Sequence, residues 1–136
     1  MDADEAREFL RRHHRAVLTT FRGDGMPQLS PVSATVDTAG RVVISTRETA
    51  VKARNLRRDP RISLCAFTDG FFGPWVQVEG RAEIVSLPDA MEPLVDYYRS
   101  VAGEHPDWAD YRAAMQREQR VVVRFDIERA GPNVSG

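Results

Sequence analysis

A mainly β fold, with six antiparallel strands closed into a small β-barrel and helices on its outside, is predicted by three features of this 136-residue sequence. Asp24-Gly25 lies between two strand-like runs and is typical of a tight hairpin turn, in which both central residues need positive φ. Runs rich in β-branched residues recur along the chain, most of them separated by short turns. Closing six such strands into a barrel removes exposed strand edges. A flat α+β sheet is the alternative architecture.

The first half of the chain is predicted to form a helix followed by three strands. Residues 3–13 carry Phe9 and Leu10 among charged residues, which is the pattern of a short amphipathic helix. Strands are expected at residues 15–21, 27–37 and 41–46. Pro27 and Pro31 each remove a backbone donor, so the second strand is expected at a sheet edge or interrupted by a bulge.

The second half is predicted to contain a short helix, two strands, two longer helices and a last strand. Apolar positions repeat with a period of about 3.6 from Glu48 to Arg58, and Asp59-Pro60 ends this helix because the residue before proline avoids the α region. The strands are expected at residues 61–67, 75–86 and 121–127, and the longer helices at 87–105 and 106–118. Residues 129–136 are expected to be a loose tail of a single domain, residues 1–136.

The start of the short helix is the strongest candidate for a binding site. Ser45 followed by Glu48 matches the capping box that begins a helix. Lys52 is the only lysine of the chain, and residues 47–61 carry six basic and two acidic side chains, a net of +4 in a chain of formal charge −1. A helix N-terminus beside a lysine suits a phosphate or carboxylate. The alternatives are that the arginines pair with acids elsewhere, and that Lys52 survived by chance on a solvated face.

Several classes of protein are disfavoured by what the sequence lacks. The near-neutral charge, and a basic run without interleaved aromatics, disfavour nucleic-acid binding. The glycines of a P-loop and the G-x-S-x-G of a hydrolase are absent, and the histidines have no metal-ligand spacing with one another or with Cys65. Cys65 stands alone and is expected to be a core residue. No signal peptide or membrane span of ~20 residues is found, so a cytoplasmic location without membrane insertion is expected.

Several separate motifs carry a resemblance to one family. They are PQLSPV at residues 27–32, Ser45-Thr46 before the helix, K-x-x-N-L-x-x-D-P-R from Lys52 to Arg61, and VEGRAEI at residues 78–84. Together they resemble the flavin and deazaflavin oxidoreductases of the FMN-binding split-barrel fold, which are pyridoxamine 5'-phosphate oxidase-like. The segment YYRSVAGEHPDWADYRAAM at residues 97–115 is similar to the subgroup, common in actinobacteria, that uses the deazaflavin coenzyme F-420.

This resemblance implies a homodimer of split β-barrels with two cofactor sites at the dimer interface. It implies a reductase that transfers a hydride from reduced F-420 to a small conjugated acceptor of the enone or quinone type, with the chemistry supplied by the cofactor. Lys52 would anchor the cofactor phosphate. The cofactor-binding residues implied are Gln28, Ser30, Pro31 and Val32 along the ring, Ser45, Thr46, Val51, Lys52 and Asn55 at the phosphate and ribityl chain, and Trp75 from the partner subunit's side. No catalytic side chain and no metal site are assigned.

Pro31 is a departure from the family pattern, because many relatives carry a polar residue there and proline cannot donate a hydrogen bond. The alternatives to the F-420 reductase are an FMN-dependent oxidoreductase of the same fold and a non-catalytic protein that binds or carries F-420 or a tetrapyrrole. Oxidation of pyridoxamine phosphate is disfavoured, because that branch reads its substrate partly with C-terminal basic residues and this chain ends in RAGPNVSG.

Overall fold

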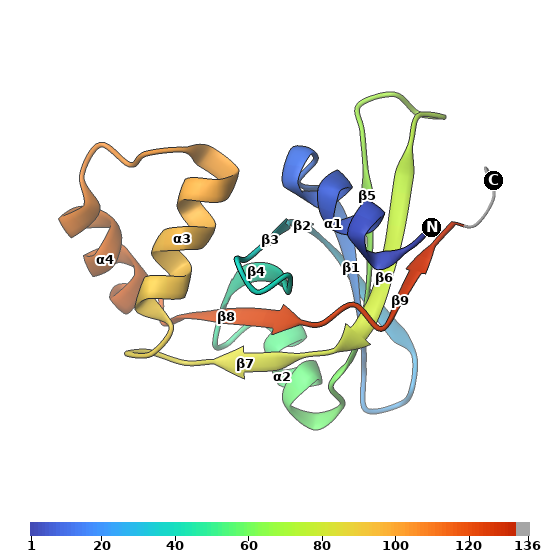
Figure 1. The fold of residues 1–136 in the computed structure, drawn as a ribbon. Helices are drawn as coiled ribbons and strands as arrows, with labels where there is room; N and C mark the ends of the chain where they lie inside the picture. The colour runs from blue at the N-terminus through green and yellow to red at the C-terminus, as the bar shows by residue number, and fades with distance from the viewer. Residues whose placement is uncertain (133–136) are drawn as a thin grey trace.

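The computed structural model describes residues 1–132, which form a mainly β domain with flanking helices (Figure 1). The helices are α1 (Ala3–Arg12), α2 (Val51–Arg58), α3 (Met91–Ala102) and α4 (Trp108–Arg117). The strands are β1 (Arg15–Phe21), β2 (Pro27–Ser33), β3 (Thr35–Val36), β4 (Val42–Arg47), β5 (Arg61–Phe67), β6 (Trp75–Arg81), β7 (Glu83–Val85), β8 (Arg120–Phe125) and β9 (Arg129–Gly131). Two antiparallel sheets result, with strand orders β2-β1-β5-β6-β9 and β3-β4-β8-β7. The predicted class is confirmed, with nine strands in the described residues instead of six.

The hydrophobic core lies between the two sheets. Alternate residues of β1 point into it, so that Ala16 and Leu18 are buried while Val17 is only half-buried. Helix α1 packs against β3, β6 and β9 and buries Ala6 and Leu10 in the same core. Each fully buried leucine of this kind stabilises the fold by roughly 1.5–3 kcal/mol. The amphipathic helix and the strands at 15–21 and 61–67 are therefore confirmed.

A second apolar cluster joins α3 and α4 to the outer face of the four-stranded sheet. Figure 1 shows these helices beside β4 and β8, on the side away from α1. Val43 and Val122 of the sheet pack there against the helices, and the Tyr111 hydroxyl donates to the carbonyl of Leu94 at 2.8 Å. Burial raises the pKa of Tyr111 to about 12. Tyr111 therefore serves to pack α4 against α3.

Two of the predicted strands are interrupted where the chain passes from one sheet to the other. The strand at 27–37 divides at Ala34 into β2, at the edge of the first sheet, and β3, in the second. Of the two alternatives expected from Pro27 and Pro31, an edge position or a bulge, the edge position is confirmed. The strand at 75–86 was expected to be continuous, and this prediction is wrong. It divides at Ala82, whose amide donates to the carbonyl of Pro60 instead of continuing a ladder.

Gly80 marks the place where β6 meets the end of β8. A Cβ built on Gly80 would overlap the carbonyl oxygen of Asp126 and would lie 2.9 Å from a ring carbon of Phe125. Only a residue without a side chain permits this close approach. The chain can then leave β6 and enter the second sheet as β7.

The predicted tail and the predicted position of Cys65 both need correction. Residues 129–131 are not loose, because they form β9 and pair with β6 through Gln77, Val78 and Glu79. The end of the predicted tail, residues 133–136, lies outside the described residues. Cys65 is half-buried on the outer face of β5 and not in the core, and burial raises the pKa of its thiol. No helix in residues 1–132 is both long and apolar enough to cross a membrane.

The predicted capping box is also wrong. Ser45 lies within β4 and pairs with Val122 of β8, so the strand continues to Arg47. The helix begins at Val51 after Ala50, which provides no side-chain cap. The Glu48 carboxylate accepts two hydrogen bonds from Arg57. Pairing with a strand about 75 residues later in the sequence therefore overrides the local helix-start signal.

Candidate functional site

Lys52 lies in the first turn of α2, where the structure leaves its positive charge without an acidic partner. The first turn of this helix contains no acidic residue. Within residues 1–132 the Lys52 ammonium makes no hydrogen bond or ion pair. Partial burial, and then the positive charge of Arg120, lower the pKa of Lys52 below its usual 10.5. The partial positive charge of the helix N-terminus adds to the same corner, so an anion placed here would be stabilised.

The arginines around Lys52 are mostly neutralised by neighbouring acids. Arg57 pairs with Glu48 at 2.7 Å, Arg61 with Asp59 at 2.7 Å and Arg47 with Glu118 at 3.2 Å. The carboxyl of Asp59 consequently has its pKa lowered to about 2, mainly by the hydrogen bonds from Arg61. For these three arginines the alternative of pairing with acids is correct. The unneutralised charge of the segment is carried by Lys52, by the exposed Arg54 and by Arg58, which bonds no acid within residues 1–132.

Arg120 belongs to this corner but was not identified from the sequence. It lies at the start of β8 directly opposite Arg47 of β4, and its guanidinium donates to Glu118 at 2.9 Å. No local motif marks Arg120. Arg120 comes near Lys52 only because β8 pairs with β4. Predicting the register of these two strands would have been needed to identify Arg120 from the sequence.

The predicted ring-side residues alternate between the two faces of β2. Gln28, Ser30 and Val32 lie opposite Thr20, Leu18 and Ala16 of β1 and share the inner face. The Ser30 hydroxyl is buried and has no hydrogen-bond partner within residues 1–132. Pro31 points outward and is exposed. An unpaired buried hydroxyl is costly, so a ligand that hydrogen-bonds it would remove that cost.

Asn55 and Thr46 are buried, and Asn55 connects α2 to β1. Its side-chain amide donates to the Thr20 hydroxyl at 3.1 Å and accepts from Arg58 at 3.0 Å. Arg58 also donates to the carbonyl of Phe21 at 2.9 Å. These bonds fix α2 against β1, and so they fix the position of Lys52. A direct contact of Asn55 with a cofactor stays a prediction.

Replacing Asn55 by alanine is expected to lower the free energy of unfolding by about 1–3 kcal/mol, because the buried Thr20 hydroxyl loses its donor and the Arg58 contact is removed. Urea unfolding followed by circular dichroism measures this change. Gln116→Ala, at an exposed position of α4, is the matched control and should change the stability by less than about 0.5 kcal/mol. Equal stabilities for the two variants would contradict the connecting role of Asn55.

Ser45, Val51 and Trp75 are placed differently from one another. Ser45 is half-buried on β4, and Val51 is 44% exposed at the start of α2. Trp75 lies opposite Phe67 at the start of β6, separated from β2 by β1 and β5. Within one chain, Trp75 is therefore not brought together with the residues of β2. Its expected contact with a cofactor requires a second subunit.

Three features of these residues suit a phosphate-bearing cofactor. The Lys52 ammonium lacks an acid, the first turn of α2 carries no carboxylate that would repel a phosphate, and the Ser30 hydroxyl lacks a partner within the described part of the chain. Each of these groups would gain an interaction from an anionic, hydrogen-bonding ligand. The residues therefore fit a cofactor of this kind.

Two antiparallel sheets closed around one core, with a cationic corner where β4 leads into α2, define the class of split-barrel cofactor-binding domains. The chain belongs to the pyridoxamine 5'-phosphate oxidase family, which matches residues 3–132. It is 30% identical over 128 residues to an F-420H(2)-dependent biliverdin reductase of Mycobacterium tuberculosis, covering 93% of this chain and 85% of the relative.

Solved structures agree with this assignment. The crystal structure of the conserved hypothetical protein Rv2991 from Mycobacterium tuberculosis matches with a TM-score of 0.78 and 28% identity, covering 100% of this chain and 92% of that one. A structure named F-420 reductase matches with a TM-score of 0.70 and 21% identity, covering 91% and 94%. The second likeness concerns the fold alone.

Proposed function

We propose that this protein is an oxidoreductase that uses reduced coenzyme F-420 to reduce a small conjugated acceptor of the enone or quinone type. The observation that carries the proposal is the partly buried Lys52 ammonium, which has no acidic partner within residues 1–132 and lies at a helix N-terminus. Support comes from the 30% identical relative, which is named as an F-420H(2)-dependent reductase and is matched along 93% of this chain.

The roles of the residues follow from their positions. Lys52 would hold the phosphate as a compact point charge, with Ser45, Thr46 and Val51 beside it on β4 and α2. Gln28, Ser30 and Val32 would line the ring from the inner face of β2, and Asn55 would keep α2 in place. The side chain of Pro31 lies on the opposite face of the strand, so a contact of Pro31 with the ring stays a prediction. When bound, the deazaflavin supplies the hydride. The chain then has to bind and orient the two reactants and limit access of water, and none of its side chains is assigned as the proton donor.

A homodimer forms part of this proposal. The outer face of the first sheet exposes Leu29 and Phe67 by 58% and 38%, and the β5–β6 loop carries Phe71 and Phe72, exposed by 92% and 94%. Apolar residues gathered on one side of a domain favour association with another protein surface. Trp75 lies on this side and would reach the partner subunit's cofactor. Light scattering during size-exclusion chromatography should give twice the mass of the chain, and the mass of one chain would contradict the role given to Trp75.

FMN is the second candidate cofactor. The family match is to pyridoxamine 5'-phosphate oxidase, and FMN also carries a phosphate that Lys52 could hold. Pro31 cannot donate a hydrogen bond to either ring system. A non-catalytic carrier of F-420 or of a tetrapyrrole would use the same residues for binding and would not turn over.

Fluorescence titration of the purified protein with oxidised F-420 and, separately, with FMN tests the proposal. Saturable binding of F-420 in the low micromolar range or tighter, with no binding of FMN, is expected. Binding of FMN alone would replace the cofactor assignment. Reduced F-420 should then be oxidised by quinone or enone acceptors in the presence of the protein. Tight binding without oxidation by any acceptor would favour the carrier.

A further inference from the structure

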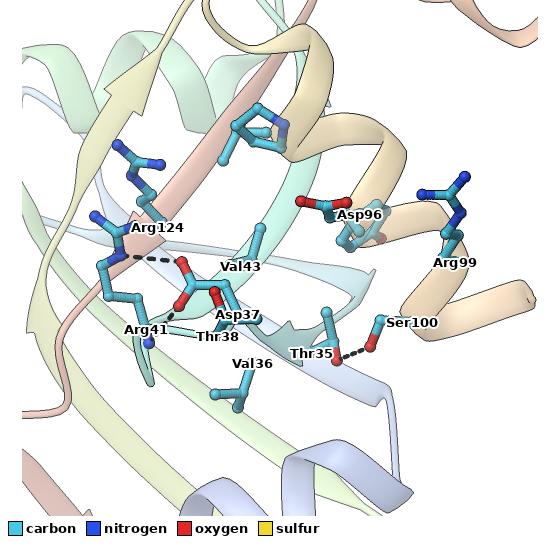
Figure 2. A pocket seen from close by; sticks show the side chains of 13 residues that line it. Thr35, Val36, Asp37, Thr38, Arg41, Val43, Asp96, Arg99, Ser100 and Arg124 are labelled. Atoms are coloured by element: carbon cyan, nitrogen blue, oxygen red, sulfur yellow. Dashed lines mark hydrogen bonds and ion pairs between the residues drawn. The ribbon is translucent and has the colours of Figure 1, made fainter.

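A cavity of about 530 Å³ lies between helix α3 and the β3–β4 side of the four-stranded sheet (Figure 2). Its lining contains none of the ten residues assigned to the cofactor. Val36 and Val43 reach its floor with 8% and 4% of their surface exposed, Val122 lies fully buried beneath them, and α3 provides the opposite wall through Pro93 and Asp96. The volume lies in the range of small-molecule sites, which are mostly apolar with a few placed polar groups. We call it the α3 cavity.

One side of the α3 cavity is cationic. Arg41 precedes β4 and Arg124 lies on β8, and Figure 2 shows both on the same side of Val43. Arg41 uses its Nε to bond Asp37 at 3.0 Å, and Arg124 uses one terminal nitrogen to bond Glu83 at 3.1 Å. The Nε of Arg124 is buried and has no hydrogen-bond partner within residues 1–132. Because a guanidinium carries five donor hydrogens, both arginines retain unused donors.

The Arg124 side chain is 19% exposed and its buried Nε is unpartnered within the described residues, which together favour an anion in this cavity. A buried donor without an acceptor costs free energy, and the cost is larger when the group is charged. Asp37 does not supply the missing acceptor: its carboxylate accepts from Arg41 and from the backbone amides of Ala39 and Arg41, and within residues 1–132 it forms no hydrogen bond with Arg124. A planar carboxylate fits the guanidinium fork well.

The opposite side of the cavity offers a single acceptor. Asp96 projects from α3 across from Arg124, with Val43 between them in Figure 2. The Asp96 carboxylate makes no hydrogen bond or ion pair with the described part of the chain. The neighbouring Arg99 does not neutralise it, since that guanidinium bonds Glu104 at 3.0 Å and lies over Trp108. Asp96 is thus available to a ligand that donates a hydrogen bond.

We propose that the α3 cavity binds a small organic acid, with its carboxylate at Arg41 and Arg124, its apolar body between Val43 of the sheet and Pro93 of α3, and an amine or hydroxyl group at Asp96. The proposal goes beyond the oxidoreductase function and does not depend on it, because the cavity shares no residue with the Lys52 corner. A site of this kind would admit an acid while the cofactor corner is either filled or empty.

The test is a titration of the full-length, ¹⁵N-labelled protein without cofactor, followed by two-dimensional NMR. The probe is 4-(aminomethyl)benzoate, with benzoate and benzylamine as probes that each lack one charged group. Saturable shifts of the Val43 and Val122 amides are expected, with the full probe binding more tightly than either fragment. Shifts centred on Lys52 and Arg120, or no shifts at millimolar probe, would overturn the proposal, as would benzylamine binding as tightly as the full probe.

Three variants assign the contacts. Arg124→Gln should weaken binding of the full probe by about tenfold or more, which is the usual effect of losing a charged hydrogen-bonding group. Asp96→Asn, at an exposed position without hydrogen bonds to lose, should weaken the full probe and leave benzoate unchanged. Arg112→Gln, which removes an arginine of α4 outside the cavity, is the control and should bind like the parent. Parent-like affinity in both Arg124→Gln and Asp96→Asn would overturn the proposal. If Arg124→Gln folds poorly, parent-like affinity in Asp96→Asn alone would overturn the contact assigned to Asp96.

Discussion

Replacing Lys52 by glutamine is expected to lower the affinity for F-420 by at least about tenfold while leaving the fold intact. A hydrogen bond to a charged group contributes roughly 1.5–3 kcal/mol, which corresponds to a factor of ten or more in the dissociation constant. The side chain makes no hydrogen bond or ion pair within residues 1–132, so its loss should not weaken the folded protein. Fluorescence titration measures the affinity, and thermal unfolding checks the fold.

Arg54→Gln is the matched control, because Arg54 is exposed on the same helix and also forms no ion pair within the described residues. Its affinity should stay within about twofold of the parent, as expected for a solvated charge. If the lysine and arginine variants lose affinity equally, the effect is a general one of local charge. If neither loses affinity, Lys52 is not the phosphate anchor.

The pH dependence of binding tests the charge of Lys52 directly. Partial burial and Arg120 lower the pKa of Lys52, so in the free protein the ammonium becomes half deprotonated at a pH below 10.5. A bound phosphate favours the charged form, so the affinity should fall as the pH rises through the lowered pKa, and Lys52→Gln should lack this fall. Stability changes in the opposite direction: between the lowered folded pKa and the ordinary unfolded value the unfolded chain binds more protons, so the contribution of Lys52 to stability increases with pH.

Replacing Gly80 by alanine is expected to destabilise the protein by about 2 kcal/mol or more. The added methyl group would overlap the Asp126 carbonyl and press on the Phe125 ring, so β6 and the end of β8 would have to separate. Overpacking in a tight interior typically costs 1–3 kcal/mol, and backbone atoms yield less easily than side chains. Urea unfolding gives the change in free energy.

Gly23→Ala is the control for this substitution. A Cβ at Gly23 would meet only the flexible end of Arg58, at 3.7 Å, which is an ordinary contact. This variant should change the stability by less than about 0.5 kcal/mol. A Gly80→Ala protein as stable as Gly23→Ala would show that the crossing of β6 and β8 tolerates a side chain.

Local patterns in the sequence were sufficient for elements whose neighbours along the chain are also their neighbours in space. The hairpin of β1 and β2 is of this kind, since Asp24-Gly25 joins them and their register runs from Arg15 opposite Ser33 to Phe21 opposite Pro27. Strand β5 pairs with β1 and follows from its own alternation. For these strands propensity and tertiary pairing agree.

The predictions that failed depend on contacts between distant parts of the chain. The helix at 51–58 starts late because β8 pairs with β4 as far as Arg47. The strand at 75–86 divides because Pro60 accepts the amide of Ala82, and residues 129–131 are ordered because β6 offers them an open edge. The same limit applies to the candidate site: Lys52 could be identified from composition, but Arg120 beside it could not. The α3 cavity depends on how α3 lies over the sheet, which no motif encodes.

The chain contains a single lysine with which amine-reactive reagents can react. Because partial burial and Arg120 lower the pKa of Lys52, a larger fraction of its side chain is the nucleophilic free amine at a given pH than for an ordinary exposed lysine. Acylation would therefore attach at the amino terminus and at one known position in the fold. A ligand bound at Lys52 would slow this acylation. Mass spectrometry of the labelled peptide could therefore report whether the site is occupied, for ligands with or without visible absorbance and also in a mixture of compounds.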